Sequence, residues 1–236
     1  MRATHLILCY ALATMAVAAQ DLSGNELLTK AIAYHDPNNN WPNFKGAFYV
    51  TMETPKKPNR ISKVYIDLPN NNFNLEEQKG KHSTIFSIEN NTCSIFLDGT
   101  TPTQEEKEKY NLNCKRANLY KNYYTYLYGL PMKLKDPGTI IHHNIELKPF
   151  KGKTYLALKV TYNEAVGKDT WYFYFNSKTY AMEAYQFYHN ESKNDGEYIL
   201  LSGEELINGI KMPKIRAWHI NKNDTLLGTD VLKSYN

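Results

Sequence analysis

The first periodic pattern along the chain is helical and covers residues 23–35. Ser23 is followed three residues later by Glu26, which is the spacing of a capping box at a helix N-terminus. The positions that follow recur at intervals of three and four residues and so share one stripe: Leu27, Leu28, Ala31, Ile32 and His35. Pro37 cannot continue a helix. The pattern therefore predicts an amphipathic helix that ends before Pro37.

From Phe44 onward the pattern is that of strands. Short runs rich in Tyr, Phe, Val, Ile and Thr alternate with Asn or Gly clusters, which favour turns. Before residue 100 the predicted strands are 44–53, 60–68, 82–89 and 93–98. After residue 138 they are 139–148, 153–163, 170–176, 180–189, 196–203, 205–208, 210–220 and 226–232. Asn176-Ser177 and Asn208-Gly209 are predicted to form hairpin turns.

Two helices are predicted to interrupt the strands. Thr101-Pro102-Thr103-Gln104 offers a cap, a first-turn proline and a capping-box glutamine, which predicts a helix over about 103–110. A second helix is predicted over about 116–128, ended by Gly129 and Pro131. One face of this helix is unusually aromatic: Leu119, Tyr120, Tyr123, Tyr124, Leu127 and Tyr128.

Closely spaced strands joined by tight turns are typical of an antiparallel meander. The predicted helices have apolar faces that must be covered. We therefore predict a mainly β (α+β) fold, a single strongly curved antiparallel sheet or half-open barrel with helices on its concave side. Neither internal repeats nor a low-complexity linker marks a boundary, so residues 20–236 are expected to form one domain.

Residues 1–19 have the composition of a secretory signal peptide. Arg2 gives a basic start, Leu6 to Val17 form an apolar run, and Ala18 and Ala19 are small residues at the expected cleavage site. The run is shorter than the roughly 20 residues that span a bilayer, and no later segment of the sequence is long and apolar enough. Cleavage after Ala18 or after Ala19 fits the pattern; we expect it after Ala19, with release into the periplasm or the medium.

Charge and cysteine content narrow the class of partner and the compartment. The chain has 28 Lys and Arg against 24 Asp and Glu, a net charge of +4, and so small an excess argues against nucleic acid as a partner. After processing, Cys93 and Cys114 remain, an even number in an oxidising compartment, and we expect them to form a disulfide. The alternatives are two buried thiols or a chance pair. No metal site or cofactor is predicted.

Sequence motifs of hydrolases and nucleotide-binding enzymes are absent from the chain, including G-x-S-x-G, S-x-x-K and H-E-x-x-H. The best polar site is His35 beside Asp36, followed by Trp41. A histidine next to a carboxylate can act as a base. A histidine in the last turn of a helix is also favoured by the helix dipole, so the position has a structural interpretation as well. No catalytic residue is predicted.

Aromatic residues make up 13% of the chain and are densest at Trp171-Tyr172-Phe173-Tyr174-Phe175. A sheet with one wet face alternates apolar and polar residues, whereas this strand is apolar on both faces. It therefore has covering helices plus a second contact surface, or it lines a cavity. The residues that we consider for such a cavity are Tyr120, Tyr123, Tyr124, Leu127, Trp171, Phe173 and Phe175.

The predicted order of helix, meander, two helices and meander resembles the lipoprotein-localisation carriers of the LolA/LolB type. Closer resemblance is to an uncharacterised family of secreted bacterial proteins placed near those carriers. It lies in Tyr34-His35-Asp36-Pro37 with Trp41, in the strand from Trp171 to Phe175, and in the ending Leu227-Gly228-Thr229-Asp230-Val231-Leu232. The resemblance covers about residues 24–232 and implies a half-open barrel, plugged by helices, that holds acyl chains.

The leading hypothesis is a periplasmic or secreted non-enzymatic binding protein with an apolar cavity for a lipid or an acylated (lipoprotein) ligand. One alternative is a secreted hydrolase that uses His35 and Asp36. Another is an envelope interaction protein with a fully packed core. No cofactor, nucleic acid or stable membrane span is expected, and the sequence implies no particular oligomeric state.

Overall fold

The computed structural model describes residues 22–235, so the predicted signal peptide and its cleavage site lie outside the described residues. Twelve strands of the described part form one sheet. Those of the first half are β1 (Lys45–Thr54), β2 (Lys57–Asp67), β3 (Asn72–Lys79), β4 (His82–Glu89) and β5 (Thr92–Leu97). Those of the second half are β6 (Thr139–Phe150), β7 (Lys153–Tyr162), β8 (Thr170–Phe175), β9 (Met182–Tyr188), β10 (Glu197–Ile207), β11 (Ile210–Ile220) and β12 (Leu226–Ser234).

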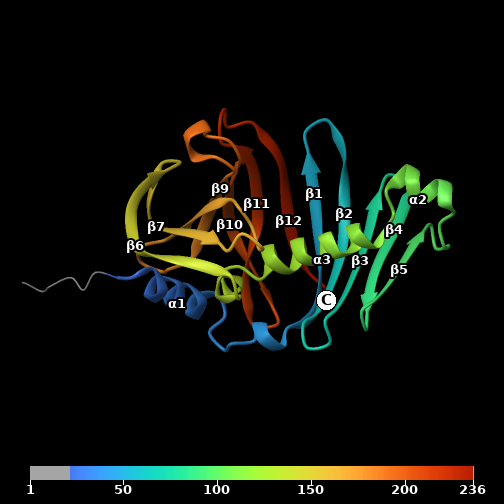
Figure 1. Cartoon of the computed structure of the whole chain (residues 1–236), viewed down its shortest axis with the longest axis horizontal. Coiled ribbons are helices and arrows are strands. Elements are labelled where there is room, and N and C mark those ends of the chain that lie inside the picture. Colours follow the sequence, from blue (N-terminus) through green and yellow to red (C-terminus); the bar gives the residue numbers. More distant parts are fainter. Residues whose placement is uncertain (1–21, 236) are drawn as a thin grey trace, which may run out of the picture.

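The sheet is antiparallel throughout, in the order β5-β4-β3-β2-β1-β12-β11-β10-β9-β8-β7-β6. The first and last strands, β1 and β12, pair in its middle. The consecutive strands β5 and β6 lie at opposite edges, and α3 (Cys114–Tyr128) carries the chain back across the sheet between them (Figure 1). The predicted fold class, a curved antiparallel sheet with helices, is confirmed.

The first helix, α1 (Gly24–His35), has the predicted capping box. Ser23 accepts from the backbone N–H of Glu26, and the Glu26 carboxylate accepts from the backbone N–H of Ser23. Its buried stripe packs against β6, β7 and β11. Gly24 lies so close to β6 that a Cβ there would be 2.0 Å from the carbonyl oxygen of His142. The start of the helix is therefore held against β6.

The helical insertion begins with α2 (Gln104–Tyr110), and its cap differs from the prediction. Thr103 is the N-cap and Glu106, rather than Gln104, completes the capping box, so Pro102 lies before the helix. The N-cap of α3 is Asn113. The expected disulfide between Cys93 and Cys114 is present, with a Cα–Cα distance of 5.9 Å, and it ties the start of α3 to the edge strand β5.

Strand β3 was not predicted, because its outward positions are Asn, Glu and Gln, which have low strand propensity. Its inward Phe73 and Leu75 are buried, and pairing with β2 and β4 on both sides overrides the local preference. The predicted break within 196–208 is also wrong, since β10 runs continuously from Glu197 to Ile207.

The two predicted hairpin turns have different outcomes. Asn208 and Gly209 both have positive φ between β10 and β11, as a two-residue turn requires. Asn176-Ser177 instead begins a longer loop to Met182. Asn176 Oδ1 accepts the backbone N–H groups of Lys178 and Thr179, and Tyr180 takes the left-handed conformation.

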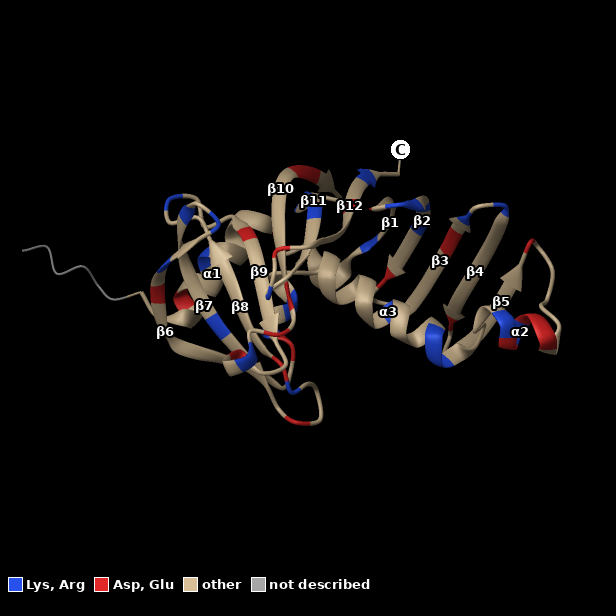
Figure 2. Ribbon diagram, turned by 90° about the horizontal axis from the view of Figure 1, so that it is seen from above, with Lys and Arg blue, Asp and Glu red and all other residues tan. Residues whose placement is uncertain are grey.

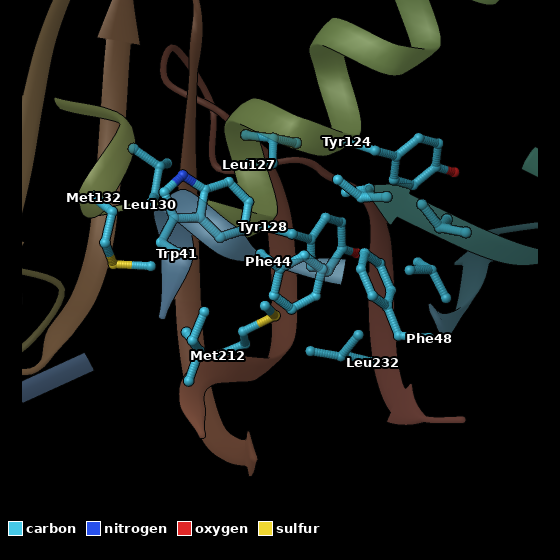
Figure 3. Packing of buried hydrophobic residues seen from close by; sticks show 14 of the residues in the cluster. Trp41, Phe44, Phe48, Tyr124, Leu127, Tyr128, Leu130, Met132, Met212 and Leu232 are labelled. Carbon is cyan, nitrogen blue, oxygen red and sulfur yellow. The ribbon is translucent and has the colours of Figure 1, made fainter. Parts of the chain in front are cut away.

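One hydrophobic core fills the concave side of the sheet. It joins the stripe of α1, the C-terminal half of α3 and the inward residues of most strands. Figure 3 shows Tyr124, Leu127 and Tyr128 of α3 next to Phe44, Phe48, Met212 and Leu232 from the sheet and its connections. The Phe48 and Tyr128 rings lie 4.7 Å apart between centroids. The interior below this part of α3 is therefore packed.

A smaller apolar cluster lies on the opposite face of β7, β8 and β9. It contains Tyr155, Tyr172 and Tyr174, and Phe150 stacks on Tyr174 with ring centroids 4.3 Å apart. Trp171, Phe173 and Phe175 of the same strand, β8, belong to the main core. The two-faced aromatic pattern of β8 therefore reflects a second contact surface.

Candidate functional site

A groove of about 580 Å³ opens beside α3. One wall is the helix face that carries Lys121, Asn122, Thr125 and Tyr126, which share a face because they are spaced by one, four and five residues. The other walls come from three segments of the chain: 66–72, 133–139 and 162–171. The volume is within the roughly 300–1,000 Å³ of small-molecule sites.

One part of the groove is aromatic and apolar. The Tyr126 and Trp171 rings meet edge to face, 6.0 Å apart between centroids. The Tyr126 and Tyr162 hydroxyls form a hydrogen bond, and burial raises the pKa of Tyr162 to about 12. Val166 adds an apolar side chain that is 58% exposed. This part of the groove offers apolar contact to a ligand. Its two phenol hydroxyls are hydrogen-bonded to each other and so add little polar character.

The acidic residues that line the groove each have a partner. Asp67 binds Lys45 at 3.1 Å and accepts from Asn70, and these hydrogen bonds lower its pKa. Asp136 forms an ion pair with Lys133. Asp169 lies 2.7 Å from the ring Nδ1 of His189, and this hydrogen bond raises the pKa of His189. The remaining charged lining residue is Lys121.

The tyrosines and Leu127 of the aromatic face of α3 point toward the sheet, as predicted, but they belong to the packed core, whereas Leu119 is exposed. Tyr124 is 1% and Leu127 is 4% exposed. Tyr124 donates to Ser62 Oγ at 3.2 Å, and burial raises its pKa to about 12. Tyr120 packs on Phe86.

Tyr123 and the β8 residues complete the predicted set. Tyr123 stacks on Trp218, with ring centroids 6.4 Å apart. Phe173 and Phe175 are fully buried. Of the seven residues considered for a cavity, Trp171 is the one that lines the groove. The sequence did contain a signal for the groove, because Lys121, Asn122, Thr125 and Tyr126 form a second stripe beside the tyrosine stripe.

His35 and Asp36 are brought together with Trp41, but in structural roles. The Nδ1 atom of His35 lies 2.7 Å from the Lys211 carbonyl oxygen, and Nε2 accepts the backbone N–H of Met182 at 2.9 Å. Asp36 accepts the backbone N–H groups of Asn40 and Trp41. His35 borders a polar depression of about 370 Å³, yet both of its ring nitrogens are occupied by backbone. Burial lowers the pKa of His35. Through these hydrogen bonds His35 connects α1 to β9 and β11, and Asp36 holds the turn that follows the helix.

Sequence reasoning missed a group of buried polar side chains on the concave side. Arg216 is 1% exposed and donates to the carbonyl oxygens of Pro213 and Leu127. Its guanidinium carbon lies 4.1 Å from the centroid of the Tyr128 ring. The hydroxyls of Tyr128 and Tyr185 have no hydrogen-bond partner in the described structure. No motif marks these residues, because they are far apart in sequence.

Within residues 22–235, no helix combines the length and apolar character needed to cross a bilayer. The same residues contain no group of three or more His, Cys, Asp and Glu side chains placed to hold a metal ion. Basic and acidic residues are interspersed along the chain (Figure 2).

Three comparisons place the chain among known proteins. A family model described as "Family of unknown function (DUF6503)" matches residues 2–233. A LolA superfamily protein from Nitrosomonas europaea has a similar structure, with a TM-score of 0.51 at 10% identity over 91% of this chain and 92% of that one. A DUF1329 family protein from Desulfovibrio piger gives a TM-score of 0.49 at 9% identity, over 89% and 90% of the two chains. No curated protein matches the sequence.

Proposed function

The chain belongs to the DUF6503 family, and we propose that it is a periplasmic or secreted, non-enzymatic protein that binds a lipid or an acylated ligand in the groove beside α3. The observation that carries the proposal is the groove itself. It is large enough for a small molecule, and its Tyr126–Trp171 wall is apolar where a chain would lie. The fold shared with a LolA superfamily protein supports the proposal but does not by itself define a function.

Two further observations support an extracytoplasmic binding protein. The Cys93–Cys114 disulfide fits an oxidising compartment, in keeping with the signal peptide that the sequence predicts. A hydrolase using His35 and Asp36 is disfavoured, since the backbone occupies both nitrogens of His35 and both oxygens of Asp36. The second candidate function is that of an envelope interaction protein, which the packed interior below Tyr124 favours.

The test is binding of a fluorescent fatty-acid analogue to the purified mature protein, with mass spectrometry of any lipid that co-purifies. Thr125→Trp places a large ring in the groove, and Leu119→Trp places the same ring on the exposed side of α3, where Leu119 is 65% exposed. We expect the first variant to weaken probe binding about tenfold or more and the second to leave it unchanged, with both melting near the wild type.

Absence of probe binding and of co-purifying lipid in the wild type would contradict the proposal and favour the interaction protein. Unchanged probe binding in Thr125→Trp would place the site elsewhere on the molecule.

A further inference from the structure

Lys121 differs from the other charged residues of the groove in having no counter-ion. Its Nζ atom donates to the carbonyl oxygen of Asn71 at 2.8 Å and to Asn71 Oδ1 at 2.6 Å. An ammonium group has three N–H donors, so one remains after these two bonds. No carboxylate in the described part of the chain pairs with Lys121, and partial burial lowers its pKa. The site therefore holds a positive charge that is neutralised by neither a partner nor full hydration.

The surroundings of Lys121 favour an acceptor group rather than a second cation. Asn72 also lines the groove, and its Oδ1 accepts the backbone N–H of Asn90 at 3.1 Å, which leaves its NH₂ group as a donor. The three groove-lining carboxylates, Asp67, Asp136 and Asp169, already bind other basic side chains. The end of the groove near the β2–β3 turn thus presents donors without a matching acceptor.

The groove is also polarised along α3. Lys121 and Tyr126 are five residues apart, so they are separated by roughly 7.5 Å along the helix axis. Tyr126 meets Trp171 at the apolar end, and Lys121 meets Asn71 at the polar end. A ligand with one charged end and one alkyl chain matches this arrangement.

From this geometry we infer that the groove binds a single-chain amphiphile with an anionic head group, which contacts Lys121 while its alkyl chain lies against Tyr126 and Trp171. The inference rests on the proposed function and specifies its ligand class. The shared chemistry is an anionic oxygen group on an alkyl chain, which a free fatty acid supplies as a carboxylate and an alkyl phosphate supplies as a phosphate. A charge-assisted hydrogen bond in a partly buried site is stronger than a neutral one, so the head group affects affinity and selectivity.

The experiment compares two probes with the same chain and label, a dansyl-labelled undecanoic acid and its methyl ester, in which the anionic carboxylate is replaced by a neutral ester. We expect the wild type to bind the acid about tenfold more tightly than the ester, as one charge-assisted contact implies. Lys121→Gln is expected to abolish this preference and leave the affinity for the ester within about twofold of the wild type. Lys121→Arg keeps the charge and is expected to retain the preference.

Lys115→Gln is the matched control, because Lys115 is an exposed lysine of the same helix that does not line the groove. It should retain the preference for the acid. Raising the salt concentration should weaken binding of the acid and leave that of the ester unchanged. Competition by dodecanoate and by dodecyl phosphate separates the two sources of the anion, and stronger competition by either one supports the inference and identifies its head group.

The outcomes separate this inference from the proposed function. If the wild type binds acid and ester equally, the inference is wrong and the apolar groove remains a binding site. If it binds neither, both are wrong. If Lys121→Gln keeps the preference for the acid, the head group does not contact Lys121 and the inference is overturned.

Discussion

Arg216 and Asp230 lie directly opposite each other in β11 and β12, yet Arg216 Nε and Asp230 Oδ1 both lack a hydrogen-bond partner in the described structure. Asp230 is 3% exposed, and the hydrogen bond to its other oxygen comes from Trp218 Nε1 at 3.0 Å. Burial raises the pKa of Asp230, although the Trp218 bond and the charges of Arg216 and Arg60 oppose the shift. The pair therefore does not behave as a simple stabilising ion pair.

This relationship predicts a pH-dependent effect of Asp230→Asn. A carboxyl whose pKa is raised on folding stabilises the protein fully below its unfolded value of 3.8, and the contribution is lost as pH rises through the folded value. The free energy of unfolding of the wild type minus that of Asp230→Asn should therefore fall as pH rises above 3.8. Urea unfolding at several pH values measures the difference, and a rise with pH would show that Arg216 and Arg60 stabilise the ionised form.

The pH dependence of stability that we predict for His35 has the opposite sign to that of Asp230. Burial lowers its pKa, so its contribution to stability is complete above the unfolded value of 6.5 and is lost as pH falls through the folded value. At neutral pH, His35→Ala leaves the Lys211 carbonyl and the Met182 N–H unpaired, which costs about 1–3 kcal/mol for each group. The difference between wild type and variant should shrink below pH 6.5. A difference independent of pH would mean that the ring titrates as it does in the unfolded chain.

The disulfide predicts a stability effect that can be separated from packing. Cys93 and Cys114 close a loop with a sequence separation of 21, and replacing both with serine should lower the free energy of unfolding by roughly 3 kcal/mol. Thiol titration of the exported, unreduced protein should find both cysteines blocked. Two titratable thiols would show that packing alone holds α3 against β5.

Gly129 provides a steric prediction at the end of α3. A Cβ at this position would lie 2.2 Å from Trp41 Cζ2 and 2.7 Å from the Thr125 carbonyl oxygen. Gly129→Ala should therefore destabilise the protein by about 1–3 kcal/mol. At Gly167 the nearest atom would be 3.9 Å away, so Gly167→Ala is the control and should be neutral or slightly stabilising. Equal melting temperatures for the two variants would mean that Trp41 moves without cost.

Much of the fold was predictable because it follows from local chemistry. The capping box at Ser23, the Asn208-Gly209 turn and the stripe of α1 each act within a few residues. Strand β3 was not predictable in this way. Its outward residues do not favour a strand, and the sheet neighbours that impose its conformation are known only in three dimensions.

The candidate site was predictable only in part. The orientation of the α3 tyrosines followed from their spacing, but spacing does not tell whether the space opposite them is filled. Phe48 and Phe73 occupy it, and they come from strands whose register the sequence does not specify. The role of Lys121 depends on Asn71, which lies 50 residues earlier in the chain. Contacts between residues so far apart in the chain produce no sequence motif.

Adjacent residues of α3 give the most direct test of a packed interior beside an open groove. Tyr124 is 1% exposed and lies in the core, with Phe73 and Tyr128 as stacked neighbours. Tyr124→Ala should therefore cost roughly 3–5 kcal/mol of stability, as truncation of other large aromatic core residues does. Tyr124→Phe loses the bond to Ser62 and should cost about 1 kcal/mol.

Thr125 lines the groove, so Thr125→Ala should leave the free energy of unfolding within about 0.5 kcal/mol of the wild type. Thermal melting and titration with the fatty-acid analogue are measured on the same preparations. We expect Tyr124→Phe and Thr125→Ala both to remain folded, and Tyr124→Phe to bind the probe as the wild type does because its ring is outside the groove. The contradicting result would be a Tyr124→Ala protein that keeps near wild-type stability and has lost probe binding. The ligand would then bind below α3, in an interior that opens, and not in the groove.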